Sequence, residues 1–356
     1  MMSSVRRSFC LCISLFLGFP LLGRSALRPR DPFVPWVTVQ SSKGGKIYFL
    51  QDSHLEVSTL FYTFDETYLR SRALPSGPIF FRYNPDKYIT GQHLSMLIES
   101  TLKEIKQKKQ NFKHFTILKD EGFNTRKQTG LLVLKAKNYP FVVKLFMETP
   151  RAFVRPYNKG FITSCHFVVG GGATRHILGF TRLPNRDTVE QMIQSSPEWK
   201  DKVDLPRKWS WFPKDEEWLT INGYNIGGHE QITVKMPGVY AIVAEAIEPK
   251  RNFSMRRSGD TKTAMHLSNF LQFRIDAHIN NFMIEKSIDP QKQGKIIIID
   301  TEHFPTMVGL KERPQIHSYI GFYWHLFTKG VKDSMFTTKK ERRNKQRNPR
   351  PPFSKP

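Results

Sequence analysis

The sequence predicts an α+β fold, and three observations support it. Short apolar strand candidates alternate with turn residues from Arg28 to Glu248. Few segments space their apolar residues as a helix does, chiefly Thr90 to Gln110 and Thr261 to Phe273. A polar loop, Asp276 to Asn281, then precedes a run of isoleucines that ends on Asp300. With 356 residues, the chain is long enough for one large domain or for two lobes with an ample core.

The first 26 residues have the pattern of an export signal. Arg6 and Arg7 form a basic start, Phe9 to Leu22 form an apolar run, and Gly23 to Ser25 form a cleavage site. The apolar run is too short to cross a membrane comfortably. We therefore predict a secreted or exported protein. The alternative is a membrane-anchored protein whose signal stays uncleaved.

The charge of the chain predicts acidic partners. The 55 Lys and Arg residues outnumber the 31 Asp and Glu residues, and the formal net charge is +24. Such a charge favours anionic lipid, a phosphate-bearing substrate or nucleic acid. Part of it lies in residues 339–356, which are basic and proline-rich without an apolar face and are predicted to be a disordered tail. No recognised nucleic-acid motif occurs, so nucleic acid is the least favoured of these partners.

The polar loop and the strand after it carry the groups of a phosphoryl-transfer site in order. Asp276 is followed five positions later by Asn281, and the isoleucine strand ends on Asp300. Phosphoryl transfer needs an Asp beside the attacking hydroxyl, and it needs groups such as Asn and a second Asp to hold Mg²⁺ on the nucleotide phosphates. We therefore predict Asp276 as a catalytic residue and Asn281 and Asp300 as metal ligands, with ATP and Mg²⁺ as cofactors.

The motifs D-x-H-x-x-N at 276–281 and I-D-x-x-H at 299–303 resemble those of the protein-kinase-like superfamily, and within it the phosphatidylinositol 3-/4-kinase branch. An acidic residue two positions after the metal Asp, here Glu302, also occurs in aminoglycoside-phosphotransferase-like kinases, so the branch stays open. The resemblance implies that His278 stabilises charge on the transferred phosphoryl group. A structural role for His278 or His303 is the alternative.

This resemblance implies a two-lobed kinase-like fold with a β-rich N-lobe and a small helical C-lobe. The chain would then divide into five parts: a signal peptide at 1–26, a β-rich extension ending in a helix at 27–110, the N-lobe at 111–248, the C-lobe at 249–338 and the basic tail at 339–356. Two further segments have other expected forms. Residues 161–183, with glycines at 170–172, are typical of strand-turn-strand, and the Trp-rich residues 197–218 are typical of a surface loop or an edge insertion.

The predicted nucleotide-binding residues lie before the polar loop. Lys144 is the lone cation in a strand candidate, 141–146, so it must either face solvent or serve a buried anion. By resemblance it matches the third-strand lysine that binds nucleotide phosphates. Glu190, on a short helix predicted at 187–193, is its expected carboxylate partner. Backbone groups near Ala246 and Ile247 would hold adenine.

Residues 122–130 lie where kinase-like folds cover the nucleotide phosphates. The segment lacks a glycine triplet, so close approach of its backbone to phosphate is weakly supported. Arg126 or Lys127 is positioned to reach a phosphate instead. An ordinary hairpin loop is the equal alternative.

The leading hypothesis is therefore an exported, ATP- and Mg²⁺-dependent phosphotransferase. Its acceptor would be the hydroxyl of a phosphoinositide in an anionic membrane, of a host protein or of a small molecule. The alternative is a catalytically inactive, pseudokinase-like protein or a basic binding module that acts at an acidic surface.

Overall fold

The computed structural model describes residues 36–51, 66–154, 172–224, 231–287 and 294–307. Contacts divide the chain into two compact units, 1–34 and 35–356, and every described residue belongs to the second. The predicted export signal at 1–26 and basic tail at 339–356 lie outside the described residues. Among the helices in the described ranges, none is both long and apolar enough to span a membrane.

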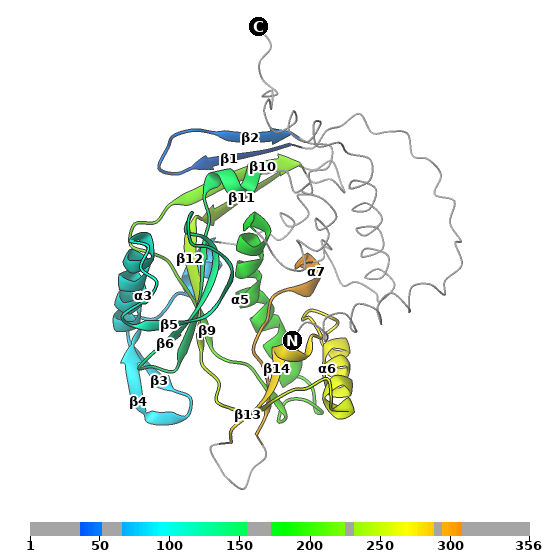
Figure 1. The fold of residues 1–356 in the computed structure, drawn as a ribbon. Helices are drawn as coiled ribbons and strands as arrows, with labels where there is room; N and C mark the ends of the chain where they lie inside the picture. The colour runs from blue at the N-terminus through cyan, green and yellow to red at the C-terminus, as the bar shows by residue number, and fades with distance from the viewer. Residues whose placement is uncertain (1–35, 52–65, 155–171, 225–230, 288–293, 308–356) are drawn as a thin grey trace, which may run out of the picture. The chain divides into compact units, whose positions relative to one another are not determined.

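The described elements form an α+β fold, as predicted (Figure 1). The helices are α2 (Glu66–Ser71), α3 (Gly91–Lys106), α5 (Gly172–Gln194), α6 (Ser258–Phe270) and α7 (Phe304–Met307), with 3-10 turns η2 (Pro150–Val154) and η3 (Ile279–Asn281). The strands are β1 (Trp36–Ser41), β2 (Tyr48–Gln51), β3 (Pro78–Phe81), β4 (Asn84–Thr90), β5 (Phe115–Asn124), β6 (Thr129–Ala136), β7 (Phe141–Met147), β8 (Val203–Asp204), β9 (Lys208–Trp211), β10 (Trp218–Tyr224), β11 (Gln231–Pro237), β12 (Val239–Glu245), β13 (Pro249–Asn252), β14 (Phe282–Glu285) and β15 (Ile296–Ile298).

A five-stranded antiparallel sheet in the order β5-β6-β7-β12-β9 carries the predicted lysine. The strands predicted at 115–118, 130–135 and 141–146 are its first three members. The two strands predicted around Pro237 and Gly238 are also present, but they belong to different sheets. Strand β12 joins this sheet, whereas β11 pairs with β10 in the four-stranded sheet β11-β10-β1-β2.

The two faces of the five-stranded sheet pack on different helices, because side chains alternate along each strand. One face, which includes Val143 and Leu145, shares a core with apolar residues of α3. The other face, which includes Phe146 and Tyr240, shares a core with Phe180 and other residues of α5. Figure 1 shows α3 and α5 on either side of these strands. Lys144 alternates with Val143 and Leu145, and therefore lies on the α5 face.

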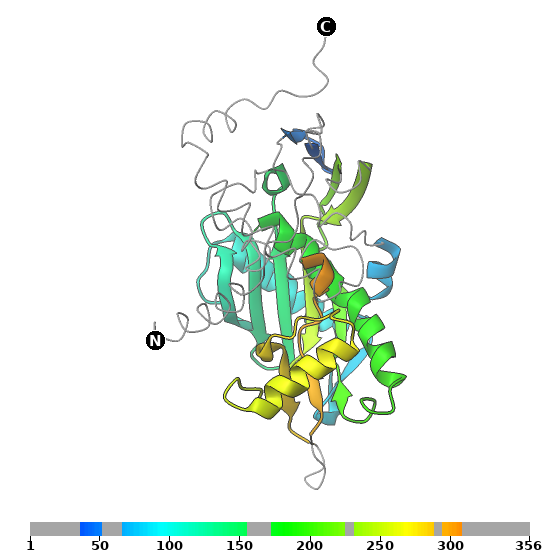
Figure 2. The same ribbon diagram turned by 90° about the vertical axis from the view of Figure 1, so that its right-hand side faces the viewer.

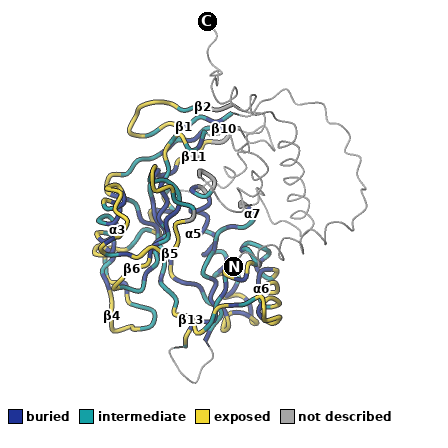
Figure 3. Tube along the Cα trace, in the orientation of Figure 1, coloured by how far each residue is buried: buried dark blue, intermediate teal, exposed yellow. Residues whose placement is uncertain are grey.

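Helix α3 is the helix predicted from Thr90 onward. Thr90 is its N-cap and accepts a hydrogen bond from the backbone N–H of His93 at 3.2 Å. Because α3 shares its core with β5 to β7, the predicted extension at 27–110 packs directly on the predicted N-lobe. Figure 3 shows the buried strands beside the exposed outer side of α3.

Helix α5 differs from the sequence prediction. Its 23 residues run from Gly172 to Gln194 through Pro184, in place of the strand expected to end at 183 and the short helix expected at 187–193. A Cβ at Gly179 would lie 2.0 Å from the Tyr240 hydroxyl and 2.7 Å from the ring of Phe146. Glycine therefore lets the helix approach the sheet closely, and this packing outweighs the low helix propensity of glycine and proline.

The Trp-rich segment also differs from its prediction. Residues 197–218 contain β8 and β9, and β9 is an edge strand of the five-stranded sheet. Trp199 and Trp211 are only 5% and 3% exposed, so the surface loop is wrong, whereas the alternative of an edge insertion agrees with β9 at the sheet edge. The tryptophans supply apolar area to the core that a surface loop would leave in water.

The predicted catalytic loop lies between α6 and the sheet β13-β14-β15-β8. Leu271, Ile275, Ile279 and Phe282 belong to one buried cluster, so apolar anchors precede, interrupt and follow the polar residues of the loop. Figure 2 shows α6 beside this sheet. The loop is thus held at several points by apolar side chains.

Replacing Gly179 with alanine tests the close approach of α5. Because the added methyl group overlaps Tyr240 and Phe146, we expect Gly179→Ala to lower the free energy of unfolding by about 1–3 kcal/mol. Gly259→Ala in α6 is the control, since its Cβ meets nothing within 4 Å. It should leave stability unchanged or raise it by up to about 1 kcal/mol. Urea unfolding of both variants measures the difference, and equal stability would contradict the close packing.

Candidate active site

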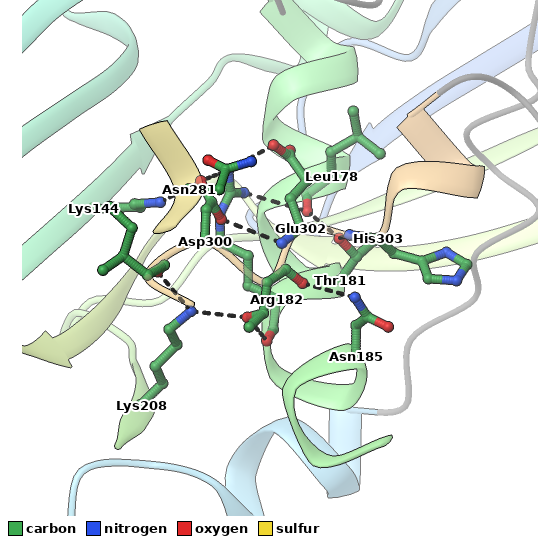
Figure 4. A network of polar contacts seen from close by, with 12 residues as sticks. Lys144, Leu178, Thr181, Arg182, Asn185, Lys208, Asn281, Asp300, Glu302 and His303 are labelled. Carbon is green, nitrogen blue, oxygen red and sulfur yellow. Dashed lines mark hydrogen bonds and ion pairs between the residues drawn. The ribbon is translucent and has the colours of Figure 1, made fainter. Parts of the chain in front are cut away.

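Three segments that are far apart in the sequence meet at the candidate site (Figure 4). Lys144 of β7 donates from Nζ to Oδ2 of Asp300 at 2.7 Å, across 156 positions of the chain. Arg182 of α5 donates from Nε to Oδ1 of Asp300 at 2.9 Å and from Nη2 to Oε2 of Glu302 at 2.8 Å. The predicted lysine and the predicted metal-binding Asp are therefore in direct contact.

The charged groups of this cluster shift one another's pKa values. Burial by itself would raise the pKa of Asp300, but the positive charges of Arg182, Lys144 and Lys208 hold that pKa well below its usual range. The side chain of Arg182 is only 5% exposed, and the nearby carboxylates raise its pKa despite the opposing effect of burial. Asp300 and Arg182 therefore form a charged pair inside the protein.

Sequence reasoning missed Arg182 and two further residues that support this cluster. Lys208 is buried and donates from Nζ to Oγ1 of Thr301 at 2.8 Å and to the carbonyl oxygen of Ile299 at 3.1 Å. Asn185 donates from Nδ2 to the carbonyl oxygens of Arg274 and Thr301, both at 3.0 Å. These contacts tie the segment around Asp300 to β9 and to α5. No pattern in the sequence singled out Lys208, which follows Arg207 at the start of β9, or Asn185.

The predicted catalytic loop is closed by its own hydrogen bonds. Asp276 accepts from the backbone N–H of His278 at 3.1 Å through Oδ1, and its carbonyl oxygen accepts from Nδ2 of Asn281 at 3.1 Å. The N–H of Ile299 donates to the carbonyl oxygen of Asn281 at 2.9 Å, which joins the loop to the end of β15. Because its amide nitrogen faces the backbone of Asp276, Asn281 can offer Oδ1 to a cation.

The two histidines of the motifs lie in different environments. His278 is exposed and caps η3, since its Nδ1 accepts from the N–H of Asn280 at 3.3 Å. His303 is buried, and its backbone N–H donates to Oγ1 of Thr181 at 3.0 Å. Burial and the positive charge of Arg274 lower the pKa of His303 to about 4, so this ring is neutral near pH 7.

The predicted pairing of Lys144 with Glu190 is wrong. Glu190 forms an ion pair with Arg186 of the same helix at 2.8 Å, while Lys144 contacts Asp300. The physical reason is the length of α5, which places Glu190 eight residues, about 12 Å along the axis, beyond the residue that reaches the site, Arg182. The helix thus presents a cation to the cluster where a carboxylate was expected.

The predicted adenine-binding residues follow β12. The backbone N–H of Ala246 donates to the carbonyl oxygen of Pro140 at 2.8 Å, so this donor is already used within the protein. Any contact of Ala246 with adenine would therefore use its carbonyl oxygen. Ile247 is half-buried between β12 and β13.

The segment predicted to cover the phosphates is a hairpin between β5 and β6. The strands extend to Asn124 and from Thr129, so the turn is only 125–128. Gln128 donates from Nε2 to the carbonyl oxygen of Ile105 at 2.5 Å, which ties the turn to the end of α3. Arg126 in this turn is exposed. The alternative of an ordinary hairpin is therefore the one that the structure shows.

Oxygen atoms of Asp276, Asn281 and Asp300 are the candidate donors for a metal ion, and those of Asp300 already accept hydrogen bonds within the protein. Within the described ranges, no group of three or more His, Cys, Asp or Glu residues could hold one. Mg²⁺ needs few protein ligands, because phosphates and water complete its octahedral shell. The pKa of Asp276 is raised by burial and also by the negative charge of Asp300, so the two carboxylates repel each other. A divalent cation between them would relieve this repulsion, and the donor set thus fits Mg²⁺.

Stability should fall in mild acid because of two buried histidines. Burial lowers the pKa of His176 and of His303 to about 4, whereas an unfolded histidine titrates near 6.5. The unfolded chain therefore binds protons that the folded chain excludes, and stability is complete above pH 6.5 and is lost as the pH falls towards 4. We expect His303→Gln to reduce this slope, to which one histidine contributes up to about 1.4 kcal/mol per pH unit. Urea unfolding at several pH values measures it, and an unchanged slope would contradict a buried neutral His303.

In comparisons with protein-family models, curated proteins and solved structures, none matches this chain. The resemblance of its motifs to kinase-like enzymes therefore stays a prediction that rests on its own residues.

Proposed function

We propose that this protein is an ATP- and Mg²⁺-dependent phosphotransferase of kinase-like, two-lobed fold that uses a hydroxyl group as acceptor. One observation carries the proposal. Lys144 of the five-stranded sheet lies 2.7 Å from Asp300, and the Asp276–Asn281 loop is hydrogen-bonded to the strand that delivers Asp300. Phosphoryl transfer needs a phosphate-binding cation, a metal-binding carboxylate and a catalytic Asp within one site.

The topology of the sheet supports the same proposal. Lys144 lies on the third strand in chain order of a five-stranded antiparallel sheet, and protein kinases also carry their phosphate-binding lysine on a third strand. Helix α5 follows that strand and packs on the face that holds Lys144. The small group of elements from β13 to α7 then carries the catalytic loop.

Each residue has a role in this proposal. Asp276 accepts a hydrogen bond from the acceptor hydroxyl and then takes its proton. The raised pKa of Asp276, caused by burial and by Asp300, makes it a better proton acceptor. Asn281 and Asp300 would hold Mg²⁺, which would neutralise charge on the phosphates. Lys144 turns from Asp300 to a phosphate oxygen, while Arg182 remains paired with Glu302.

The acceptor is proposed from the sequence. A net charge of +24 favours an anionic acceptor, so we place a phosphoinositide first and a host protein second. Export, likewise, is proposed from the pattern of residues 1–26.

A catalytically inactive binding protein is the second candidate function, and one observation favours it. Both carboxylate oxygens of Asp300 are already engaged, because Oδ1 accepts from Arg182 and from the N–H of Glu302, and Oδ2 accepts from Lys144. A metal ion must compete with these internal partners. If these internal contacts are more favourable than metal binding, nucleotide does not bind and the protein only binds a partner.

Nucleotide binding separates the two candidates. With Mg²⁺ and a non-hydrolysable ATP analogue at about a hundred times its dissociation constant, the full chain should gain about 2.7 kcal/mol of stability, a Tm rise of a few degrees. Asn281→Ala should lose the Mg²⁺-dependent part of this rise, whereas Asn280→Ala, at the exposed neighbouring position, should keep it. Thermal unfolding measures both, and no shift at millimolar ligand would favour the inactive protein.

Phosphotransfer itself depends on Asp276. We expect Asp276→Asn to reduce the transfer rate by about a hundredfold or more, because the amide accepts no proton, while the Tm rise with nucleotide persists. Asp86→Asn, at an exposed position of β4, is the control and should leave the rate unchanged. The assay follows transfer of the γ-phosphate to phosphoinositide vesicles and to a generic protein acceptor. A fully active Asp276→Asn variant would exclude this role.

A further inference from the structure

The hairpin between β5 and β6 offers the proposed site no glycine-rich phosphate loop. Its turn holds no glycine, and Gln128 fastens it to the end of α3. Backbone N–H groups can cradle a phosphate only where the chain approaches it closely, which usually requires several glycines. A polyphosphate bound in the proposed site must therefore find a cation on another element.

The surroundings of Gly122 in β5 include a cation from another element. A Cβ built at Gly122 would be 2.1 Å from Nη1 of Arg175, 3.2 Å from its Cζ and 3.9 Å from its Cδ. These three atoms of Arg175 are the nearest that such a Cβ would meet. The arginine of α5 thus lies against β5 at a position without a side chain.

Arg175 and Arg182 belong to one row of cations. They are seven residues apart on α5, which is close to two helical turns, so they lie on the same face of the helix. Burial raises the pKa of Glu302, and the positive charges of Arg182, Lys144 and Arg175 oppose that rise. Arg175 is therefore near enough to act on the same carboxylate as the other two cations.

The three cations contact different parts of the protein. Lys144 and Arg182 both contact Asp300, at 2.7 and 2.9 Å. Arg175 lies against β5, an edge strand of the five-stranded sheet. Arginine presents a planar fork of donors that binds phosphate oxygens in pairs, and it keeps its charge at any physiological pH.

We propose that Arg175 binds the polyphosphate chain of the nucleotide, and that helix α5 thereby supplies the phosphate contact that the glycine-poor hairpin lacks. The ligand class is a linear triphosphate, either free or esterified to a nucleoside. This inference rests on the proposed function, because it places the nucleotide beside Lys144 and Asp300. Arg175 of α5 would then make the phosphate contact that the sequence suggested for Arg126 or Lys127.

The test uses inorganic tripolyphosphate without Mg²⁺, so that neither adenine nor the metal site contributes. Calorimetric titration of the full chain should show binding that Arg175→Ala weakens about tenfold or more. Arg126→Ala is the matched control, since it removes the same side chain from the exposed hairpin turn, and it should change affinity less than twofold. Arg175→Lys should restore part of the loss, because it returns the charge without the fork.

Gly122→Ala gives an independent check. Its backbone φ is ordinary and the nearest atoms belong to one side chain, so the variant should fold while its methyl group displaces Arg175. We expect the same loss of affinity as in Arg175→Ala, and the double variant should lose no more than either single variant. If the losses of affinity in the two single variants add up in the double variant, Gly122→Ala does not act by displacing Arg175.

The outcomes separate this inference from the proposed function. Equal losses in Arg126→Ala and Arg175→Ala, or no binding of tripolyphosphate by the wild type, would overturn the role of Arg175 even if Mg²⁺ and ATP still raise the Tm. Conversely, tripolyphosphate binding that depends on Arg175 supports the inference even where no phosphotransfer is detected. Repeating the titration with ATP tells whether the nucleoside adds affinity.

Discussion

The ion-pair cluster around Asp300 is the interaction on which the rest of the site depends. Taking charged groups out of water is costly unless each gains well-placed partners. Asp300 meets this condition through Lys144 of β7 and Arg182 of α5, which are both far from it in the sequence. The cluster therefore joins the five-stranded sheet, helix α5 and the segment after β15, to which the Asp276–Asn281 loop is hydrogen-bonded.

Helix α5 gives this cluster its geometry. Its close approach at Gly179 brings Arg182 over the ring of Phe146, with 5.7 Å between the guanidinium carbon and the ring centroid. The same helix carries Asn185, whose amide binds the carbonyl oxygens of Arg274 and Thr301. One helix thus positions both Arg274, before the Asp276–Asn281 loop, and Thr301, directly after Asp300. Changes in its packing would reach every part of the site.

The same contacts that stabilise the site also compete with its proposed ligands. Asp300 is engaged by protein donors on both oxygens, and a metal ion must displace part of this set. Phosphates offer Lys144 an alternative anion, so metal and nucleotide would enter most easily together. Arg182 also contacts Glu302, so it has a second carboxylate partner besides Asp300. Binding in such a site is an exchange of ion pairs, whose free-energy difference is much smaller than either interaction alone.

Local sequence determined the strands from β5 to β7, helices α3 and α6, and the Asp276–Asn281 loop, because apolar spacing, capping residues and turn residues act over a few positions. It also singled out Lys144 as a cation in an apolar strand. The continuous helix α5, the burial of Trp199 and Trp211, and the partner of Lys144 were decided only by the tertiary structure. Each depends on contacts between distant segments, such as Gly179 with Tyr240 or Lys144 with Asp300, and no local pattern encodes them.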